Sequence, residues 1–161
     1  MQEILQAVCP SDAREISTAH GKEYGCDVCP GFSSFRGEHF NPRGRLNFQF
    51  SKILTGSFTA ARAKQTLAEF FGCEPHSENF GGTLLLEDSG TSLQRVRFYP
   101  GIIGMLRTWR MKDGRDVVLT QGGDTGQGVS TNWVPTFKFP AVGGPVQRML
   151  VEATDSFSIY C

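Results

Sequence analysis

A pattern that occurs twice, about 50 residues apart, is the feature that most constrains the fold of this chain. In its first copy, Leu-Thr-Gly-Ser-Phe-Thr at 54–59 leads through a small polar stretch into Gln-Thr-Leu-Ala-Glu-Phe at 65–70. In its second copy, Leu-Arg-Thr-Trp-Arg-Met at 106–111 leads through a short turn into Asp-Val-Val-Leu-Thr at 116–120. Self-similarity at this period predicts one β-rich supersecondary unit that is used twice.

Aligning the two copies places aromatic and aliphatic residues at matching positions. Phe58 falls on Trp109 and Leu67 falls on Val118, and the pair Asn-Phe at 79–80 matches Asn-Trp at 132–133. A tryptophan in a β domain either fills the core or, when exposed, stacks on a sugar ring. Because repeat equivalence favours burial, we interpret both tryptophans as core residues.

The composition favours a turn-rich β protein with an aromatic core, because 19 glycines, 8 prolines and 13 phenylalanines occur in 161 residues. Sixteen basic and 16 acidic residues cancel, which argues against nucleic acid or an anionic membrane as an obligate partner. No apolar run approaches the roughly 18 residues that span a bilayer, so we expect no membrane insertion.

Five cysteines are more than a cytosolic domain of this size usually carries, and their number is odd. They are Cys9, Cys26, Cys29, Cys73 and Cys161. We predict a disulfide from Cys9 to Cys26 or Cys29 that fixes the amino-terminal arm, and a bond from Cys73 to Cys161 is a further candidate. These predictions favour an extracytoplasmic location, periplasmic or secreted. The amino end lacks a basic leader and a long apolar segment, so a signal peptide is expected to be absent from this chain.

Alternation of apolar and polar residues predicts a series of antiparallel strands. The expected strands are 46–50, 52–56, 66–71, 81–87, 93–99, 105–111, 116–120, 133–139, 146–151 and 157–160. Turn sequences predict two hairpins, one around Asp-Ser-Gly at 88–90 and one around Asp-Gly at 113–114. A capping residue at Ser11 and a glycine at Gly21 predict a short helix between them. Residues 25–45, 121–128 and 140–145 are expected to be loops, and 59–65 suits either a loop or a helix.

The predicted fold is therefore all-β, with antiparallel hairpins in a propeller-blade-like or sandwich-like arrangement. Residues 1–45 are expected to form a loop-rich, cysteine-containing arm, and 46–161 an antiparallel β domain with blade-like units at about 54–87 and 105–139. The motif Gly-Ser-Phe-Thr at 56–59 and the later strand–Asp-Gly–strand resemble the FG-GAP (integrin-type) repeat of β-propeller proteins. The segments 71–82 and 113–128 also resemble exported bacterial proteins that carry such repeats. The resemblance implies a blade fold but no calcium site, because residues 59–65 contain no acidic side chain.

The sequence Cys26-Asp-Val-Cys29 has the CxxC spacing of redox and zinc sites. Pro-Gly follows directly, and no strand–helix–strand pattern surrounds it, which argues against a thioredoxin-like site. Cys9, Cys26 and Cys29 are candidate zinc ligands together with a histidine or Cys73, but the second half of such a site lacks a paired spacing. A structural disulfide remains the simplest interpretation.

Cys73 and His76 are the candidate catalytic residues, as a nucleophile and its base. Pro75 lies between them, and a structural turn explains the cluster equally simply. Asp113 and Asp116 are a candidate carboxylate pair for hydrolysis, against a role in stabilising the turn beside Arg115.

The glycine-rich segment 122–128 lacks the Gly-Lys-Ser/Thr of a phosphate loop, so it is predicted to be a flexible loop whose tip contacts a ligand. Its candidate binding residues are Asp124, Thr125 and Gln127, together with Trp133 in the following strand.

The function that the sequence favours is a non-catalytic extracytoplasmic domain that binds a protein or carbohydrate partner through its loops and needs no cofactor. The first alternative is a thiol-dependent or hydrolytic enzyme centred on Cys73 and His76. The second is a small zinc-stabilised structural module.

Overall fold

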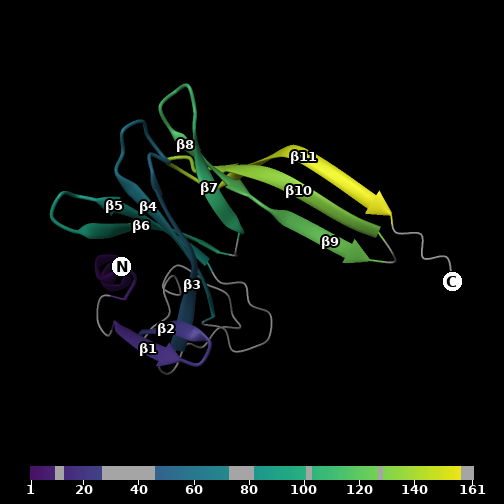
Figure 1. The fold of residues 1–161 in the computed structure, drawn as a ribbon. Coiled ribbons are helices and arrows are strands. Elements are labelled where there is room, and N and C mark those ends of the chain that lie inside the picture. The colour runs from purple at the N-terminus through teal and green to yellow at the C-terminus, as the bar shows by residue number, and fades with distance from the viewer. Residues whose placement is uncertain (10–12, 27–45, 73–81, 101–102, 127–128, 157–161) are drawn as a thin grey trace. The chain divides into compact units, whose positions relative to one another are not determined.

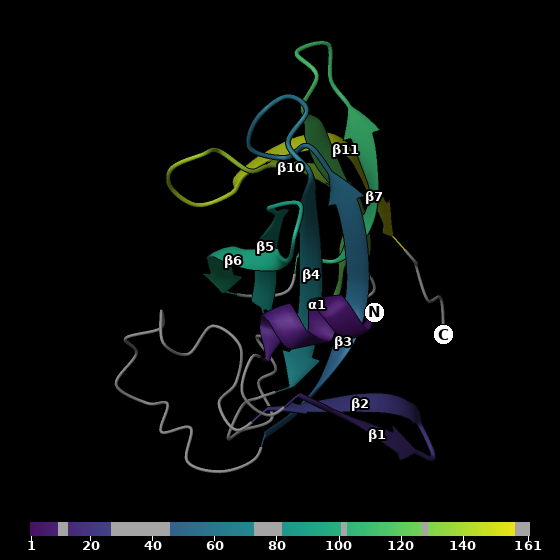
Figure 2. The ribbon, with the colours of Figure 1, turned by 90° about the vertical axis from the view of Figure 1, so that its left-hand side faces the viewer.

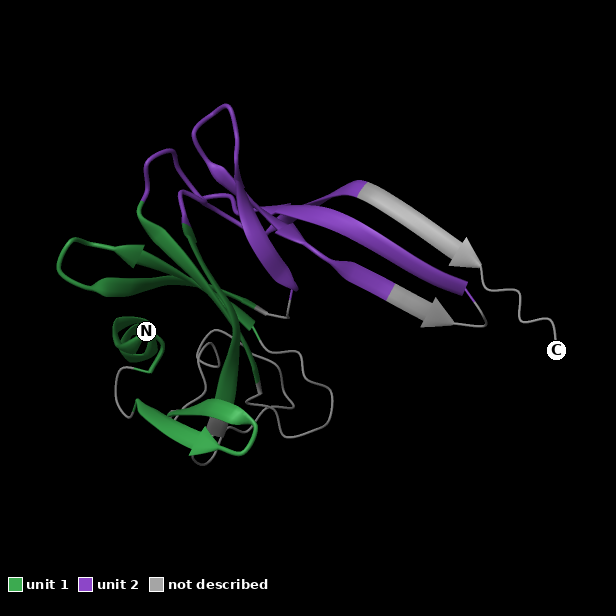
Figure 3. Ribbon diagram, in the orientation of Figure 1, with its two compact units in different colours: residues 1–55, 64–102 green, residues 56–63, 103–161 purple. Residues whose placement is uncertain are grey.

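A computed structural model of the chain describes residues 1–9, 13–26, 46–72, 82–100, 103–126 and 129–156 (Figure 1). These residues form one short helix and two antiparallel sheets, neither of which closes on itself, so the predicted all-β antiparallel class is confirmed. The chain divides into two compact units (Figure 3). The first comprises 1–55 and 64–102, and the second comprises 56–63 and 103–161.

The sheet of the first unit is a meander in which strands that follow one another in sequence lie side by side, in the order β1-β2-β3-β4-β5-β6. Its strands are β1 (Arg14–Thr18), β2 (Gly21–Cys26), β3 (Leu46–Gly56), β4 (Gln65–Gly72), β5 (Gly82–Asp88) and β6 (Leu93–Pro100). β5 and β6 form the hairpin that the sequence predicted around 88–90. The two segments expected at 46–50 and 52–56 are one continuous strand, β3.

Strands β4 and β5 are buried on both faces, because residues 65–70 and 82–86 are all buried. One face of the sheet carries the main hydrophobic cluster of the first unit, which includes Phe48, Phe70, Leu84 and Leu86. The rings of Phe48 and Phe70 lie 5.6 Å apart in an edge-to-face arrangement, a geometry that aromatic pairs prefer. This cluster is the main source of hydrophobic stabilisation in the first unit.

The helix α1 (Gln2–Val8) covers this cluster (Figure 2). Leu5 and Val8 are buried within it. They are three residues apart, and helical residues at that spacing point to the same side. The described part of the predicted arm therefore packs as part of the first unit.

The short helix predicted between Ser11 and Gly21 is wrong, because residues 14–18 form β1 and pair with β2. Ile16 and Thr18 are β-branched and favour extended backbone. Gly21 takes a positive φ of 123° at the turn, a conformation that side chains disfavour. The hydroxyl of Thr18 accepts from the backbone N–H of His20 and donates to the carbonyl of Gly21, at 3.2 and 2.9 Å. This turn closes a hairpin where a helix was expected.

The sheet of the second unit has the order β11-β10-β8-β7, and β9 also pairs with β10. Its strands are β7 (Met105–Arg110), β8 (Asp116–Thr120), β9 (Gly122–Gly126), β10 (Val129–Lys138) and β11 (Val146–Ser156). The predicted hairpin at 113–114 is confirmed by the antiparallel pairing of β7 with β8. Gly114 supplies the positive φ, 79°, that this turn requires.

The loop predicted at 121–128 is corrected by β9, which pairs with β10 from Gly122 to Gly126. Gly122 lies opposite Trp133, and any side chain at Gly122 would overlap the indole ring. The glycines therefore let a strand run beside a large aromatic residue, a role that composition alone does not distinguish from flexibility.

Candidate functional site

Several residues selected from the sequence lie outside the described residues. They are the catalytic candidates Cys73 and His76, the metal candidate Cys29, the disulfide candidate Cys161 and the binding candidate Gln127. Asp124 and Thr125 lie in β9, opposite Thr131 and Ser130 of β10. The structure therefore does not test the thiol-enzyme hypothesis.

Cys9 is buried at the end of α1, beside strand β2. Its sulfur lies 3.2 Å from the carbonyl oxygen of Gly25, the residue that precedes Cys26 at the end of β2. Cys9 and the backbone of Cys26 are thus neighbours in the first unit. Within the described ranges, no group of three or more His, Cys, Asp or Glu residues is placed to hold a metal ion.

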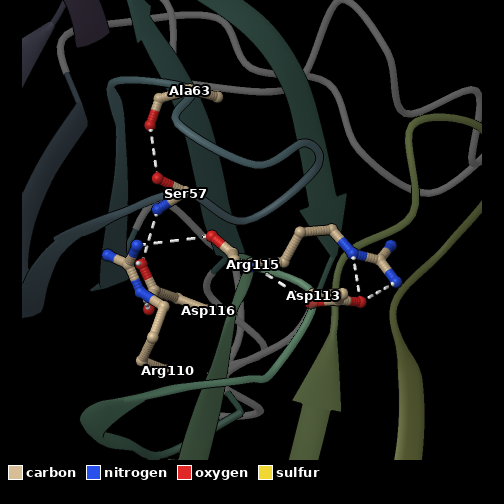
Figure 4. Close-up of polar contacts among 7 residues, drawn as sticks. Ser57, Ala63, Arg110, Asp113, Arg115 and Asp116 are labelled. Atoms are coloured by element: carbon tan, nitrogen blue, oxygen red, sulfur yellow. Dashed lines mark hydrogen bonds and ion pairs between the residues drawn. The ribbon is translucent and has the colours of Figure 1, made fainter.

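Asp116 is the centre of a polar network next to the turn of the β7–β8 hairpin (Figure 4). Its side chain is almost fully buried and receives two hydrogen bonds from Arg110, from Nε at 2.6 Å and from Nη2 at 3.0 Å. The backbone N–H of Ser57 donates a third, at 2.7 Å, and the N–H of Asp116 donates to the carbonyl of Ser57 at the same distance. The carboxylate and the backbone of Asp116 thus both attach the segment 56–63 to the hairpin.

Asp113 belongs to a separate ion pair at the exposed tip of the hairpin. Arg115 donates to its carboxylate through Nη2 at 2.7 Å, Nε at 3.0 Å and the backbone N–H at 3.0 Å. The Arg115 side chain, followed by its backbone N–H, lowers the pKa of Asp113 below its ordinary value. Because each aspartate is bound by its own arginine, the pair has the arrangement expected of turn stabilisation, the ordinary explanation of this cluster.

The interpretation of Trp109 as a core residue is wrong, because 57% of this residue is exposed. The repeat alignment placed it on Phe58, which is buried and lies between strands, whereas Trp109 lies within β7. The other aligned pair behaves as expected, since Leu67 and Val118 are both fully buried in strands. Trp133 is partly buried, with its ring against Gly122.

Two arginines lie on the same face of the second sheet as Trp109. Arg107 is two residues before Trp109 in β7, and alternate residues of a strand point to one face. Residues that lie directly opposite one another on neighbouring strands also share a face. Arg107 of β7 lies opposite Leu119 of β8, and Leu119 lies opposite Thr136 of β10. Thr136 in turn lies opposite Arg148 of β11, so Arg107 and Arg148 are at the two ends of one row across the sheet. Both arginines are exposed.

Lys138 lies on this face as well, because it is two residues after Thr136 in β10. Lys138 pairs with Val146 of β11, which is exposed. On the other side of the face, Trp109 pairs with Val117 of β8, which is buried. We call this surface the cationic face of the second sheet, defined by Arg107, Trp109, Lys138 and Arg148. It combines one exposed indole with three basic side chains.

Sequence reasoning missed this face, although part of the signal was present. Arg107 and Trp109 have the spacing of neighbours on one strand face, which the alternation of β7 already indicates. Their relation to Arg148 depends on the pairing of four strands and on irregularities in β7 and β10, which no local pattern reveals.

A shallow pocket adjoins the hairpin and is lined by Phe58, Met111, Lys138 and the neighbouring charged residues. It has room for about one water molecule, which is too little for an enclosed substrate. No helix among the described residues is long and apolar enough to cross a membrane.

Comparison of the chain with protein-family models, with curated proteins and with solved structures gave no match.

Proposed function

We propose that the protein is a non-catalytic binding domain that works outside the cytoplasm and binds carbohydrate through the cationic face of its second sheet. The observation that carries the proposal is the exposure of Trp109 within strand β7, one residue before the strand ends. An indole exposed on a sheet offers a flat apolar surface with a polar edge, which matches the alternating apolar and hydroxyl-bearing surfaces of a sugar ring. The proposed contact is therefore a strand face rather than a loop tip.

Rigidity of the β7–β8 hairpin supports this role. The ion pair of Arg110 with Asp116 lies next to Trp109 in the ladder, since Arg110 and Asp116 are directly opposite residues. The same carboxylate holds the segment 56–63 through Ser57. An indole on a fixed strand loses little conformational freedom on binding, which favours affinity.

Two observations support a non-catalytic role. Both carboxylates of the hairpin are bound by arginines, and the adjoining pocket holds about one water molecule. A glycosidase instead needs two carboxylates facing each other across a bound sugar.

Replacing Trp109 with alanine is expected to weaken carbohydrate binding about tenfold or more, because stacking on the indole is lost. Affinity electrophoresis through gels that contain dextran, xylan or polygalacturonate measures the effect, and Trp109→Phe should retain part of the affinity. Val96→Ala, which shortens an exposed apolar residue of β6, is the matched control. If none of these polysaccharides retards the protein, or if Trp109→Ala binds as the wild type does, the proposal is wrong.

The extracytoplasmic location is proposed from the five cysteines. The position of the buried Cys9 beside the end of β2 supports a disulfide to Cys26. Counting thiols in the denatured, non-reduced protein should give one free thiol per chain, because two disulfides use four of five cysteines. Five free thiols would contradict this location, and bound zinc together with them would favour the zinc-module alternative. A single fast-reacting Cys73 would favour the thiol enzyme.

We also propose that the two sheets are arranged in a blade-like or sandwich-like manner and that the chain is similar to FG-GAP repeats. Equal burial of Leu67 and Val118, at matching positions of the two repeat copies, supports it.

A further inference from the structure

We infer that the polysaccharide recognised by this face is acidic, carrying carboxylates along its chain. The inference rests on the proposed carbohydrate binding and adds the charge of the ligand to it. It is argued from the sign, spacing and pairing of the charges around Trp109.

The charges in the two rows that define the face are of one sign. One row runs through Arg107, Leu119, Thr136 and Arg148, and the next contains Trp109, Val117, Lys138 and Val146. None of these eight positions is acidic. Two aspartates lie beyond them, since Asp113 borders Lys138 at the tip of the hairpin and Asp155 pairs with Ser130 farther along β10. A partner that covers the face must therefore balance positive charge or leave it desolvated, and desolvated charge is costly.

None of the three cations forms an ion pair with a described residue, in contrast to the other arginines of the hairpin. Arg110 is bound to Asp116 and Arg115 to Asp113. Lys138 lines a pocket together with Asp113 and Asp116, and these carboxylates already have Arg115 and Arg110 as their partners. The charge of Lys138 is only the smallest of the causes that lower the pKa of Asp113. The positive charge of the face is thus left for a ligand.

The spacing of the cations suits an extended polymer. Arg107 and Arg148 lie in one row and are separated by three strand-to-strand steps of about 4.8 Å each, or about 14 Å in total. Trp109 is in the adjacent row beside Arg107. A chain crossing the strands would place one ring on the indole while its carboxylates reach the two guanidinium groups.

Arginine and tryptophan together favour an acidic polysaccharide over an acidic peptide. A guanidinium group binds a carboxylate through two parallel hydrogen bonds, which serves either ligand. The exposed indole adds a flat platform that a sugar ring covers and a run of acidic peptide side chains does not. The inference therefore commits to uronic acid polymers as the ligand class.

Three polymers test the inference on the full chain under non-reducing conditions. Polygalacturonate supplies sugar rings and carboxylates, its fully methyl-esterified form supplies the same rings without charge, and poly-L-glutamate supplies carboxylates without rings. Isothermal titration at low ionic strength is expected to show about tenfold tighter binding of polygalacturonate than of the ester, because charge complementarity is strongest there.

The variant pair Arg107→Gln/Arg148→Gln should lose about tenfold in affinity for polygalacturonate and lose clearly less affinity for the ester, which has no carboxylates for the guanidinium groups to bind. The double variant Lys52→Gln/Lys112→Gln is the matched control, since it removes the same net charge from exposed lysines elsewhere. It should bind polygalacturonate as the wild type does. Thermal unfolding followed by circular dichroism verifies that all variants are folded.

Different results separate the failure of this inference from that of the proposed function. Equal binding of polygalacturonate and its ester, lost in Trp109→Ala, would overturn the acidic ligand and leave carbohydrate binding standing. Binding of poly-L-glutamate as tight as that of polygalacturonate would overturn it in favour of an acidic protein. If none of the three polymers binds, both proposals fail.

Discussion

Replacing Phe70 with alanine is expected to lower the free energy of unfolding of the first unit by about 3–5 kcal/mol, the usual cost of removing a buried phenylalanine side chain. Phe70 is fully buried in β4. Its ring contacts Phe48 edge-to-face at 5.6 Å and stacks near Phe98 at 6.2 Å. The substitution removes hydrophobic burial and leaves a cavity that strands on both sides cannot easily close.

Urea denaturation followed by far-ultraviolet circular dichroism measures this change. Val96→Ala in β6 is the matched control, because 47% of Val96 is exposed and such sites usually change stability by less than about 0.5 kcal/mol. If Phe70→Ala does not fold, Phe70→Leu replaces it in the test, because leucine keeps most of the side-chain volume of phenylalanine. An unchanged midpoint in both Phe70 variants would show that the cluster contributes little to stability.

Most strands of the two sheets, all but β1, β2 and β9, were predictable because their signals are local. Alternation over 93–99 and the Asp-Gly turn at 113–114 gave β6 and the β7–β8 hairpin. Period-two alternation records which side chains face the core, and a glycine in the turn supplies a backbone conformation that other residues avoid. These features depend on neighbours within a few residues.

The errors arose where tertiary pairing overrides local preference. A capping residue at Ser11 and the polar sequence after it favoured a helix, but 14–18 pair with β2 instead. The glycines of 122–126 favoured a loop, but they form a strand beside Trp133. In both cases the backbone partner lies in another segment, and local propensity is a weak prior against such pairing.

The candidate site was predictable only in part. Repeat equivalence predicts Trp109 in the core, whereas the structure exposes it. Arg107 and Arg110 flank Trp109 closely, and a strand with charges on both faces near a tryptophan indicates an exposed edge. β7 is indeed the last strand of its sheet in the described part of the chain. The contribution of Arg148 depends on strand order, which a single sequence does not contain.

Replacing Asp116 with alanine is expected to destabilise the second unit by about 2–4 kcal/mol, because a buried carboxylate with charged and backbone partners is lost. Its removal leaves the backbone N–H of Ser57 without its acceptor and frees the guanidinium of Arg110. Since the side chain of Arg110 is 61% exposed, water can solvate it, which keeps the loss below that of a fully buried pair. Thermal unfolding followed by near-ultraviolet circular dichroism of the tryptophans measures the change.

The tip of the same hairpin supplies the control. Asp113→Ala also removes an aspartate that is paired with an arginine, but this pair is exposed, so the midpoint should change little.

Gly56→Ala tests the network from the opposite side, because a methyl group at Gly56 would lie 2.7 Å from Oδ2 of Asp116. That carboxylate is held by Arg110 and Ser57 and has little room to move, so Gly56→Ala should destabilise the second unit in the same direction as Asp116→Ala. Equal effects of Asp116→Ala and Asp113→Ala would show that burial of the carboxylate contributes nothing beyond the ion pair.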